Sequence, residues 1–506
     1  MQIELGQKLL PSTLVIGNTI DISGLSISPD FMFFSWLMAS AEGGPTSNSA
    51  RFGFGFTGGT SLDGHIAGAR RQGEDPYGTQ SAIRTDSCIS AMSASGAYAM
   101  SGAVKFNTWI DGGVRLECIS NFSQDLLVEF MAISGIGAFD VHTLTEPASA
   151  GEQVKSGLGF APGSLFCLGT SMSAINSGGA HWLLSIGCAT GIESTEQAVL
   201  SGIERSSLGS GDLTSYNRGG EVICLYPTGT SNPTPDARAS VSNLAADGYT
   251  LTWSERAASR TILVLALQAS LELGTLLTRT DTNPFTEAYT SAPAGILFFS
   301  NTEAETPQDT GPTGGNCPYS IGAATDPSNR WCVATRGNGD GATLGSIIGL
   351  FIRSRSVYFN FNASDTADGE MDIDADGLGA SEMALIMDDA DPSQAFVWYV
   401  IFPSVALDVR PRLLRYHENA HVSRMLGRTV ILDPFGREIP PNELQVDEWI
   451  RSDGAFMPTS RKFSSLALDP AAGYIEAVDE RRAQLRITVV REGLFESVMR
   501  RLGRGG

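Results

Sequence analysis

Three similar stretches decide the fold: SPDFMFFS at residues 28–35, APGSLFCL at 161–168 and APAGILFFS at 292–300. Their prolines lie 133 and 131 residues apart. A second anchor, an Asp-Gly pair, begins at Asp111, Asp247 and Asp376, with spacings of 136 and 129 residues. Two anchors that share nearly one period indicate three copies of a single module.

Each proline leads into a continuous apolar run, and these runs are Phe31–Met38, Leu165–Leu168 and Ile296–Phe299. Aromatic and β-branched runs bounded by Gly and Pro predict buried strands. Alternating strands follow the first two Asp-Gly pairs, at Val114–Cys118 and Tyr249–Trp253. An Asp-Gly pair between strands predicts a β-hairpin at each of the three positions.

Further strands complete each copy. A second strand is predicted after a polar loop, and an apolar strand closes the copy: these are Arg51–Phe56, His181–Cys188 and Arg330–Ala334, then Leu126–Ile133, Thr261–Leu267 and Ala395–Phe402. Strands and turns without helix-length periodicity are typical of an all-β chain. We therefore expect a mainly β protein with three tandem antiparallel β-sandwich or jelly-roll-like repeats, at 1–145, 146–280 and 281–408.

A different composition begins near Val409 and predicts a separate, Arg-rich α+β domain at 409–506. Arg410–Leu426 is predicted as a helix that starts just after Pro411. Residues 426–444 are predicted as a hairpin that turns at Asp433–Gly436. A strand at Gln484–Val490 and a short helix at Leu494–Leu502 would end the domain.

The charge is uneven along the 506 residues, whose formal net charge is −21. Residues 409–506 hold 16 Lys and Arg against 13 Asp and Glu, whereas residues 1–408 hold 18 against 42. An acidic body repels a phosphate backbone, so nucleic-acid binding by the repeats is not expected. The basic tail is expected to contact an acidic surface, either of a partner or of the chain's own repeats.

The chain is expected to be soluble and to fold in a reducing compartment. The N-terminal residues carry no basic segment typical of a signal peptide, and no apolar run reaches the ~18–20 residues of a membrane helix. Seven cysteines, without a Cys-x-x-Cys pair, are predicted to be buried reduced thiols rather than a disulfide framework. They are Cys88, Cys118, Cys167, Cys188, Cys224, Cys317 and Cys332.

One motif has the form of a zinc site. His417, Glu418 and His421 match His-Glu-x-x-His, which on a helix places two imidazoles on one face with a carboxylate beside them. The motif resembles that of the zincin metalloproteases. The resemblance implies that His417 and His421 would be ligands, Glu418 the base, and Glu443 a third ligand.

The surroundings of this motif favour a different interpretation. Arg415 precedes it and Arg424 follows it, whereas the zincin helix is apolar around the motif because it lies buried. No upper domain that would supply substrate-binding strands is visible. The favoured hypothesis is a surface helix without zinc, so no metal site and no catalytic residue is predicted.

A second motif, at Asp372, Asp374 and Asp376, resembles the start of a calcium loop. The twelfth position, which needs a bidentate Glu, is Met383, and Glu382 falls one residue short. Ten acids lie within residues 365–391, while residues 356–409 hold no Lys or Arg. Two hypotheses stay open, a solvated acidic sheet edge and a weak calcium site, and the first is favoured.

Six tryptophans are spread two to a repeat: Trp36, Trp109, Trp182, Trp253, Trp331 and Trp398. Two hypotheses are open for these tryptophans: they pack in the cores of the repeats, or they form an aromatic platform that binds a glycan. Their apolar sequence neighbours favour core packing. No Gly-x-Ser-x-Gly elbow with suitable partners occurs, and His65, His142 and His181 fall at unrelated points of the repeats. No enzyme activity and no cofactor are predicted.

These features together resemble the structural proteins of tailed bacteriophages and related particles: tandem all-β modules, an acidic Gly/Ser/Thr/Ala-rich body, reduced cysteines and a small terminal domain. The resemblance implies a virion protein of the tail, neck, fibre or decoration type, assembled in the bacterial cytoplasm. Its partners would be its own copies, in a symmetric oligomer, and other virion proteins. A glycan-binding adhesin is the first alternative, and a zinc metalloprotease centred on His417 is the second.

Overall fold

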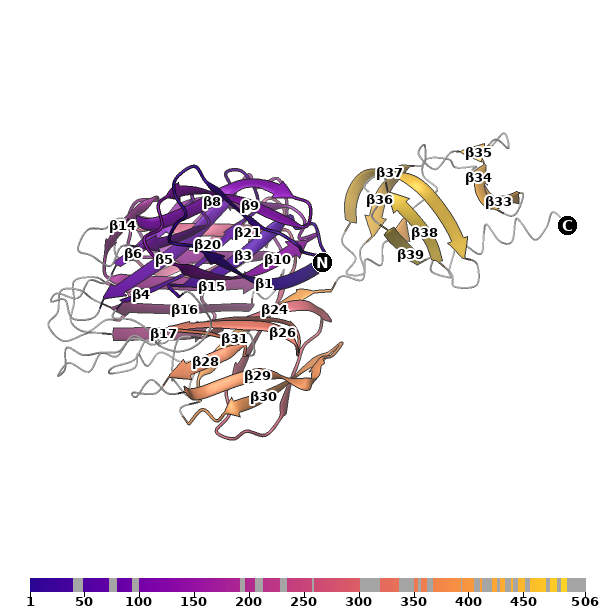
Figure 1. The fold of residues 1–506 in the computed structure, drawn as a ribbon. Coiled ribbons are helices and arrows are strands. Elements are labelled where there is room, and N and C mark those ends of the chain that lie inside the picture. The colour runs from indigo at the N-terminus through magenta and orange to yellow at the C-terminus, as the bar shows by residue number, and fades with distance from the viewer. Residues whose placement is uncertain are drawn as a thin grey trace. The chain divides into compact units, whose positions relative to one another are not determined.

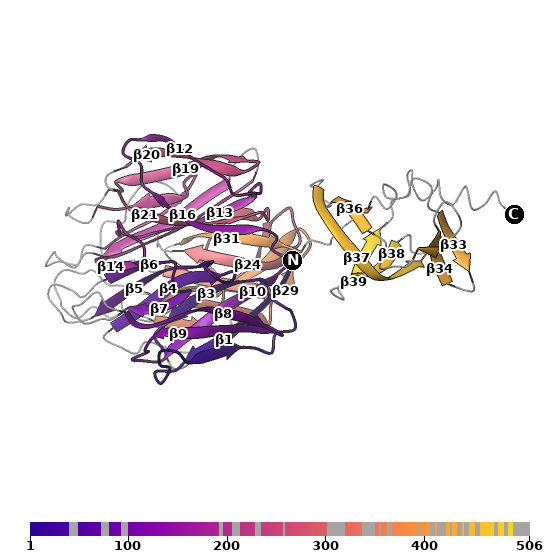
Figure 2. The ribbon, with the colours of Figure 1, turned by 90° about the horizontal axis from the view of Figure 1, so that it is seen from above.

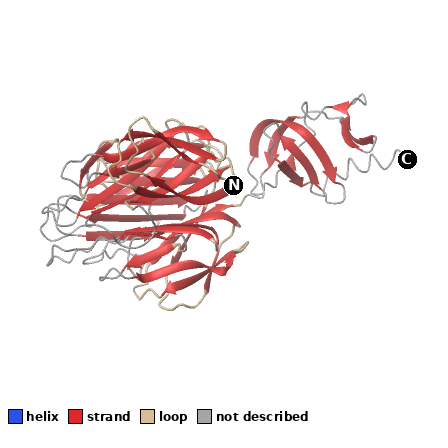
Figure 3. Cartoon of the chain, in the orientation of Figure 1, coloured by secondary structure: helices blue, strands red, loops and turns tan. Residues whose placement is uncertain are grey.

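The structure, a computed structural model, consists of strands and loops (Figures 1 and 3). It describes residues 1–39, 49–71, 80–92, 100–191, 196–204, 213–227, 234–256, 259–300, 319–335, 350–353, 356–361, 367–392 and 394–404, and eight strands between 410 and 488. No helix occurs in these ranges. Residues Met1–Ser404 form one compact unit and Val405–Gly506 another. The mainly β fold predicted from the sequence is confirmed.

The first repeat is a sandwich of two antiparallel sheets. The inner sheet has the order β1-β10-β3-β4-β5-β6-β14, and the outer sheet has the order β2-β9-β8-β7. The strands are β1 (Gln2–Leu10), β2 (Thr19–Ile22), β3 (Phe31–Leu37), β4 (Ser49–Thr57), β5 (Asp63–Arg71), β6 (Gln80–Arg84), β7 (Ile89–Met92), β8 (Met100–Ile110), β9 (Gly113–Ser120) and β10 (Leu126–Ser134).

The second repeat has the same topology, with inner order β11-β21-β13-β15-β16-β17 and outer order β12-β20-β19-β18. Its additional strand β14 (Ser177–Ala180) extends the first repeat's inner sheet at β6. The other strands are β11 (Phe139–Thr145), β12 (Gly151–Ser156), β13 (Ser164–Gly169), β15 (Trp182–Thr190), β16 (Glu196–Glu204), β17 (Leu213–Gly219), β18 (Ile223–Leu225), β19 (Ala237–Ala245), β20 (Gly248–Glu255) and β21 (Thr261–Leu267).

The third repeat again has the inner order β22-β31-β24-β25-β26-β27 and the outer order β23-β30-β29-β28. Its strands are β22 (Glu272–Leu277), β23 (Phe285–Ala288), β24 (Pro293–Ser300), β25 (Tyr319–Asp326), β26 (Asn329–Thr335), β27 (Leu350–Arg353), β28 (Tyr358–Phe361), β29 (Ala367–Leu378), β30 (Glu382–Asp389) and β31 (Phe396–Pro403). In every repeat the last strand therefore lies between the first and the third.

The repeated anchors have the expected places in these sandwiches. The apolar run after each proline is the buried third strand, β3, β13 or β24. The first two Asp-Gly pairs lie at the turns of the β8–β9 and β19–β20 hairpins. The third pair differs, because Asp376 and Gly377 lie inside β29, where the register with β30 is irregular and Gly377 has a φ of 72°. The turn follows at residues 379–381 instead.

The third repeat also differs from its expected alignment in one strand. Arg330–Ala334, the predicted counterpart of Arg51–Phe56 and His181–Cys188, lies in β26, the fifth strand, whereas those two lie in the fourth strand of their repeats. The fourth strand of the third repeat is β25, which the apolar pattern did not predict. Trp182 on β15 and Trp331 on β26 therefore occupy different positions of the repeat.

Two strands lie before the repeat boundaries expected at 145/146 and 280/281. β11 pairs with β21, and β22 pairs with β31, so each belongs to the sheet of the repeat that follows it. Both are first strands at a sheet edge, and both mix polar with apolar residues. Their sequences carry little of the apolar pattern that marks the central strands.

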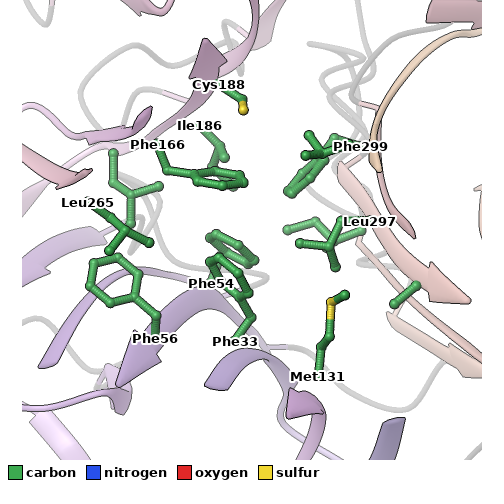
Figure 4. Packing of buried hydrophobic residues seen from close by; sticks show 14 of the residues in the cluster. Phe33, Phe54, Phe56, Met131, Phe166, Ile186, Cys188, Leu265, Leu297 and Phe299 are labelled. Atoms are coloured by element: carbon green, nitrogen blue, oxygen red, sulfur yellow. The ribbon is translucent and has the colours of Figure 1, made fainter. Parts of the chain in front are cut away.

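The inner sheets of all three repeats bury one common hydrophobic core. Its residues include Phe33 and Phe54 of the first repeat, Phe166 of the second, and Leu297 and Phe299 of the third. Figure 4 shows these side chains pointing toward one another from their separate sheets. Three further clusters, one per repeat, fill the space between each inner sheet and its own outer sheet. Figure 2 shows β13 and β24 between the outer strands of the first and second repeats.

Contacts between the repeats run in a closed cycle. The first strand of the first repeat, β1, packs on β25 and β26 of the third. The first strand of the third, β22, packs on β15 and β16 of the second. Phe139 on β11 completes the cycle by contacting Phe31 of the first repeat, with ring centroids 5.2 Å apart. One chain thus builds the interfaces that a cyclic trimer would build from three chains.

Hydrogen bonds also connect the repeats across these contacts. The Tyr319 hydroxyl donates to the Leu184 and Gly202 carbonyls of the second repeat at 2.8 and 3.0 Å. The Trp331 indole donates to the Phe130 carbonyl of the first repeat at 3.2 Å. The Asn217 amide donates to Phe396 of the third repeat at 2.7 Å. Because these groups are buried, the bonds fix the mutual orientation of the repeats.

The C-terminal unit contains two small antiparallel sheets, with orders β32-β36-β37-β38-β39 and β33-β34-β35. Its strands are β32 (Arg410–Pro411), β33 (His421–Met425), β34 (Arg428–Leu432), β35 (Glu438–Ile439), β36 (Gln445–Ile450), β37 (Phe456–Asp469), β38 (Tyr474–Asp479) and β39 (Gln484–Thr488). The predicted hairpin is confirmed by the pairing of β34 with β35, and the predicted C-terminal strand corresponds to β39.

The helix predicted over Arg410–Leu426 is wrong where the structure describes it. Arg410 and Pro411 lie in β32, and His421–Met425 forms β33, which pairs with β34. Val422 and Met425 lie three residues apart, a spacing that also suits one face of a helix, and the strand is established by its pairing with β34. The helix predicted at 494–502 lies outside the described residues.

Candidate functional site

The motif with the form of a zinc site does not lie on one helix. His421 begins strand β33, opposite Leu432, whereas His417, Glu418 and Glu443 lie outside the described residues. Two imidazoles share a helical face only if the whole motif is helical. Within the residues that the structure describes, no group of three or more His, Cys, Asp or Glu side chains could hold a metal ion.

The calcium-like motif belongs to strand β29. Asp372 forms an ion pair with the Arg330 guanidinium of β26 and is only 7% exposed. Burial raises the pKa of Asp372 to about 6, and Arg330 offsets part of that rise. Asp374 is half-buried, and the side chain of Asp376 lies outside the described residues. Asp372, the carboxylate expected at the first position of a calcium loop, is therefore paired with the Arg330 guanidinium.

The tryptophans form cores, as the favoured hypothesis expected. Trp36, Trp182, Trp253, Trp331 and Trp398 are each at most 3% exposed. Trp109 is half-buried and packs against Phe106 at the edge of the first repeat's own core. Among the described residues, the exposed large hydrophobic side chains are all aliphatic. These five tryptophans do not provide an aromatic platform at the surface.

The cysteines and histidines also have structural surroundings. Six cysteines are buried and free, and Cys317 lies outside the described residues. Burial raises the pKa of Cys167 to about 12, so its thiol stays protonated. His65 is fully buried between the Ser87 carbonyl and the Ser90 hydroxyl, and burial lowers its pKa to about 4. His142 contacts Asp140 and the Tyr249 hydroxyl, each at 2.6 Å.

Polar side chains converge at one corner of each repeat, where the first strand ends and the last strand begins. In the first repeat the corner is exposed, and there the Asp125 carboxylate accepts a hydrogen bond from the Ser12 backbone N–H at 2.7 Å. Beside it, Val15 and Ile16 are 45% and 62% exposed. The other two repeats bury a charged group at the same corner.

Arg260 is the buried group at the corner of the second repeat. Its guanidinium donates to Glu146 at 3.0 Å, to Asp236 at 2.7 Å and to the Tyr226 carbonyl at 3.0 Å. Burial raises the pKa of Asp236, and Arg260 beside it offsets part of the rise. Above this cluster lies an open hollow of about 500 Å³, lined by Ser149, Ala150, Asp236, Ser254, Glu255 and Arg256.

Asp391 is the buried group at the corner of the third repeat. Its carboxylate accepts hydrogen bonds from the Thr278 hydroxyl at 2.7 Å, the Tyr358 hydroxyl at 3.0 Å and the Ala395 backbone N–H at 3.1 Å. Its own backbone N–H donates to the Arg279 carbonyl at 2.8 Å. Asp391 thus ties the end of β22 to the segment that precedes β31.

The hollow above Asp391 has a volume of about 530 Å³. It is lined by Thr275, Leu276, Leu277, Thr278, Arg279, Thr280, Asp281, Glu287, Gln394 and Phe396. Gln394 has a φ of 51°, in the left-handed region that few non-glycine residues adopt. Its side-chain amide donates to the Thr278 carbonyl at 3.3 Å. The walls of this hollow are therefore set by buried hydrogen bonds before any ligand binds.

Neither hollow could be located from the sequence. Arg260 and Gln394 immediately precede closing strands that the apolar pattern did predict, but their partners lie far away in the chain. A lone Arg before an apolar strand was the one available signal, and it is common in solvent-exposed loops.

Comparisons with known proteins identify no family. No family model and no curated protein matches the chain. The solved structure of a β-fructofuranosidase from Schwanniomyces occidentalis, in complex with fructosyl-erythritol, aligns at 9% identity. The alignment covers 78% of this chain and 98% of that one, with a TM-score of 0.11. A likeness of this size supports no statement about the chain's fold or activity.

Proposed function

We propose that the chain is a structural or assembly component of a phage virion, in the tail, neck or fibre or as a decoration protein. The observation that supports this proposal most is the closed cycle of three sandwiches around one aromatic core. Such a body places three outer sheets and their loops on one rigid support. Assembly proteins work through fixed surfaces of this kind rather than through a single reactive site.

The chemistry of the interior agrees with this proposal. His65 and His142 are held in hydrogen-bond networks, and six of the cysteines are buried. In the described part of the chain no helix has the length and apolar character that a bilayer span needs.

Association between copies is part of the proposal. The inner sheets of the three repeats already pack on one another within a single chain. We therefore expect the outer sheets and loops to make the contacts with further copies and with other virion proteins. Light scattering coupled to size exclusion measures the association directly. A mass that corresponds to a symmetric oligomer is expected, and a monomer at high protein concentration would contradict self-association.

The decisive test of the function is the place of the protein in purified particles. Quantitative mass spectrometry of density-purified particles is expected to find the chain in a fixed ratio to the other virion proteins. Cryo-electron microscopy of the same particles should then show a three-lobed density at the site of attachment. Absence of the chain from the particles, with the protein recovered in the soluble fraction, would overturn the proposal.

The zinc metalloprotease alternative has no such support, because His421 lies on strand β33, opposite Leu432 of β34, and not on a helix. Elemental analysis of the purified full chain tests it separately. Stoichiometric zinc would revive the alternative, and its absence would remove it.

A further inference from the structure

The hollow of the third repeat presents hydrogen-bond donors and acceptors together. Its lining residues include Arg279, Thr280, Asp281, Glu287 and Gln394, whose side chains carry a guanidinium, a hydroxyl, two carboxylates and an amide. Leu277, which is 40% exposed, adds an aliphatic surface. A volume of about 530 Å³ lies in the range of small-molecule sites.

Arg279 is held in place but its hydrogen-bonding capacity is unused. Its guanidinium lies over the Phe285 ring, 4.5 Å from the centroid, and its backbone carbonyl is fixed by Asp391. Among the described residues, the guanidinium has no hydrogen bond and no ion pair. Stacking on an aromatic face limits the rotamers of an arginine, so less side-chain entropy is lost when a ligand binds.

Glu287 is the complementary acceptor. It is half-buried on β23, and burial raises its pKa while Arg279 offsets part of that rise. Within the described ranges its carboxylate accepts no hydrogen bond. Neither the half-buried carboxylate nor the held guanidinium has a hydrogen-bond partner in the described part of the chain, so a ligand that supplies hydroxyl groups would stabilise both.

The matching hollow of the second repeat shows the difference. In that hollow Asp236 forms an ion pair with Arg260 at 2.7 Å, and Glu255 forms an ion pair with Arg238 at 2.7 Å. Its lining has an arginine, two acids and two serine hydroxyls, much like that of the third repeat, but both carboxylates are already paired. Similar composition with different pairing makes it an internal control for the hollow of the third repeat.

We propose that the third-repeat hollow is a binding site for a neutral saccharide, held by Arg279, Glu287 and Gln394. Vicinal hydroxyls donate and accept at once, which matches a guanidinium and carboxylates set side by side. An anionic ligand would meet Asp281 and Glu287, and a cation would meet Arg279. An apolar ligand would desolvate these groups without giving them partners. The proposal rests on the hollow alone and holds whether or not the chain is a virion protein.

Saturation-transfer NMR and calorimetry on the full chain test this site. The probes are the methyl glycosides of glucose, galactose, mannose and N-acetylglucosamine, with sialic acid and glucuronic acid as charged comparisons. We expect at least one neutral glycoside to bind with a Kd of about 1 mM or tighter. R279A and E287Q are each expected to weaken that binding at least tenfold.

The matched control is R256A, which removes the exposed arginine of the second-repeat hollow and should leave binding unchanged. Thermal melts of all variants separate loss of binding from loss of folding. Three results would overturn the proposal: no neutral glycoside binds, binding persists in R279A and E287Q, or the acidic sugars bind better than the neutral ones. None of these results bears on whether the chain is present in purified particles.

Discussion

The pair Phe33 and Phe166 tests the shared core at one contact between repeats. Phe33 lies on β3 of the first repeat and is fully buried. Its ring centroid is 5.3 Å from Phe166 of the second repeat and 5.9 Å from Phe402 of the third. Truncation of such a buried phenylalanine typically costs about 3–5 kcal/mol. We therefore expect F33A to lower the free energy of unfolding by about that amount.

A double-mutant cycle isolates the contribution of the contact between repeats. Aromatic pairs contribute about 0.5–1.5 kcal/mol beyond their buried area. F33A and F166A should therefore be non-additive by about that amount in urea unfolding followed by tryptophan fluorescence. The control cycle pairs F166A with F34A, because Phe34 lies on the opposite face of β3, in the first repeat's own core.

Additivity is expected in the control cycle, within about 0.3–0.5 kcal/mol. The same additivity in the Phe33–Phe166 cycle would refute the reasoning, because it would mean that the two repeats do not pack through these rings. A large coupling in the control cycle would equally show that the effect spreads through the sheet and does not arise from the contact.

Three further predictions concern buried polar groups. R260M should lower the free energy of unfolding by about 3–5 kcal/mol, because it removes the guanidinium from the buried ion pair with Glu146. R115M, at an exposed pair, should change the urea midpoint little. Burial raises the pKa of Asp63 to about 6, so the stability that its protonated form contributes, about 3 kcal/mol, is lost as the pH rises from 4 to 7. D63N should flatten this part of the pH profile of unfolding, and an unchanged slope would contradict the assignment. Peptide mapping after native-state alkylation should find the buried thiols, Cys167 among them, unlabelled, and rapid labelling without unfolding would show that the cores open.

The central strands could be predicted from the sequence because their signals are local. The run from Phe31 to Met38 is apolar throughout, and its period in the chain reveals the repeats. The first strands β11 and β22 mix polar and apolar residues and have no continuous apolar run, so each is recognisable only by the partner strand that it meets. The helix expected near His421 failed for a related reason, because the segment forms a strand through its pairing with β34 and not through a local pattern.

The closed cycle and the corner hollows depend on contacts that sequence patterns do not encode. The apolar faces of β3 and β13 predict burial but not that both faces bury the same core. Asp391 and Arg260 are charged residues shortly ahead of apolar strands, and their partners lie more than one hundred residues away at Thr278 and Glu146. Only the fold places these groups together.

Native-state hydrogen exchange, resolved by mass spectrometry over the full chain, tests the central claim most directly. If the three repeats share one core, the amides of β3, β13 and β24 open in a single cooperative unit. We predict that their opening free energies converge on one value and decline together as denaturant is added. Three separate values, one for each repeat and each with its own denaturant dependence, would show that the sandwiches are independent and would contradict the account.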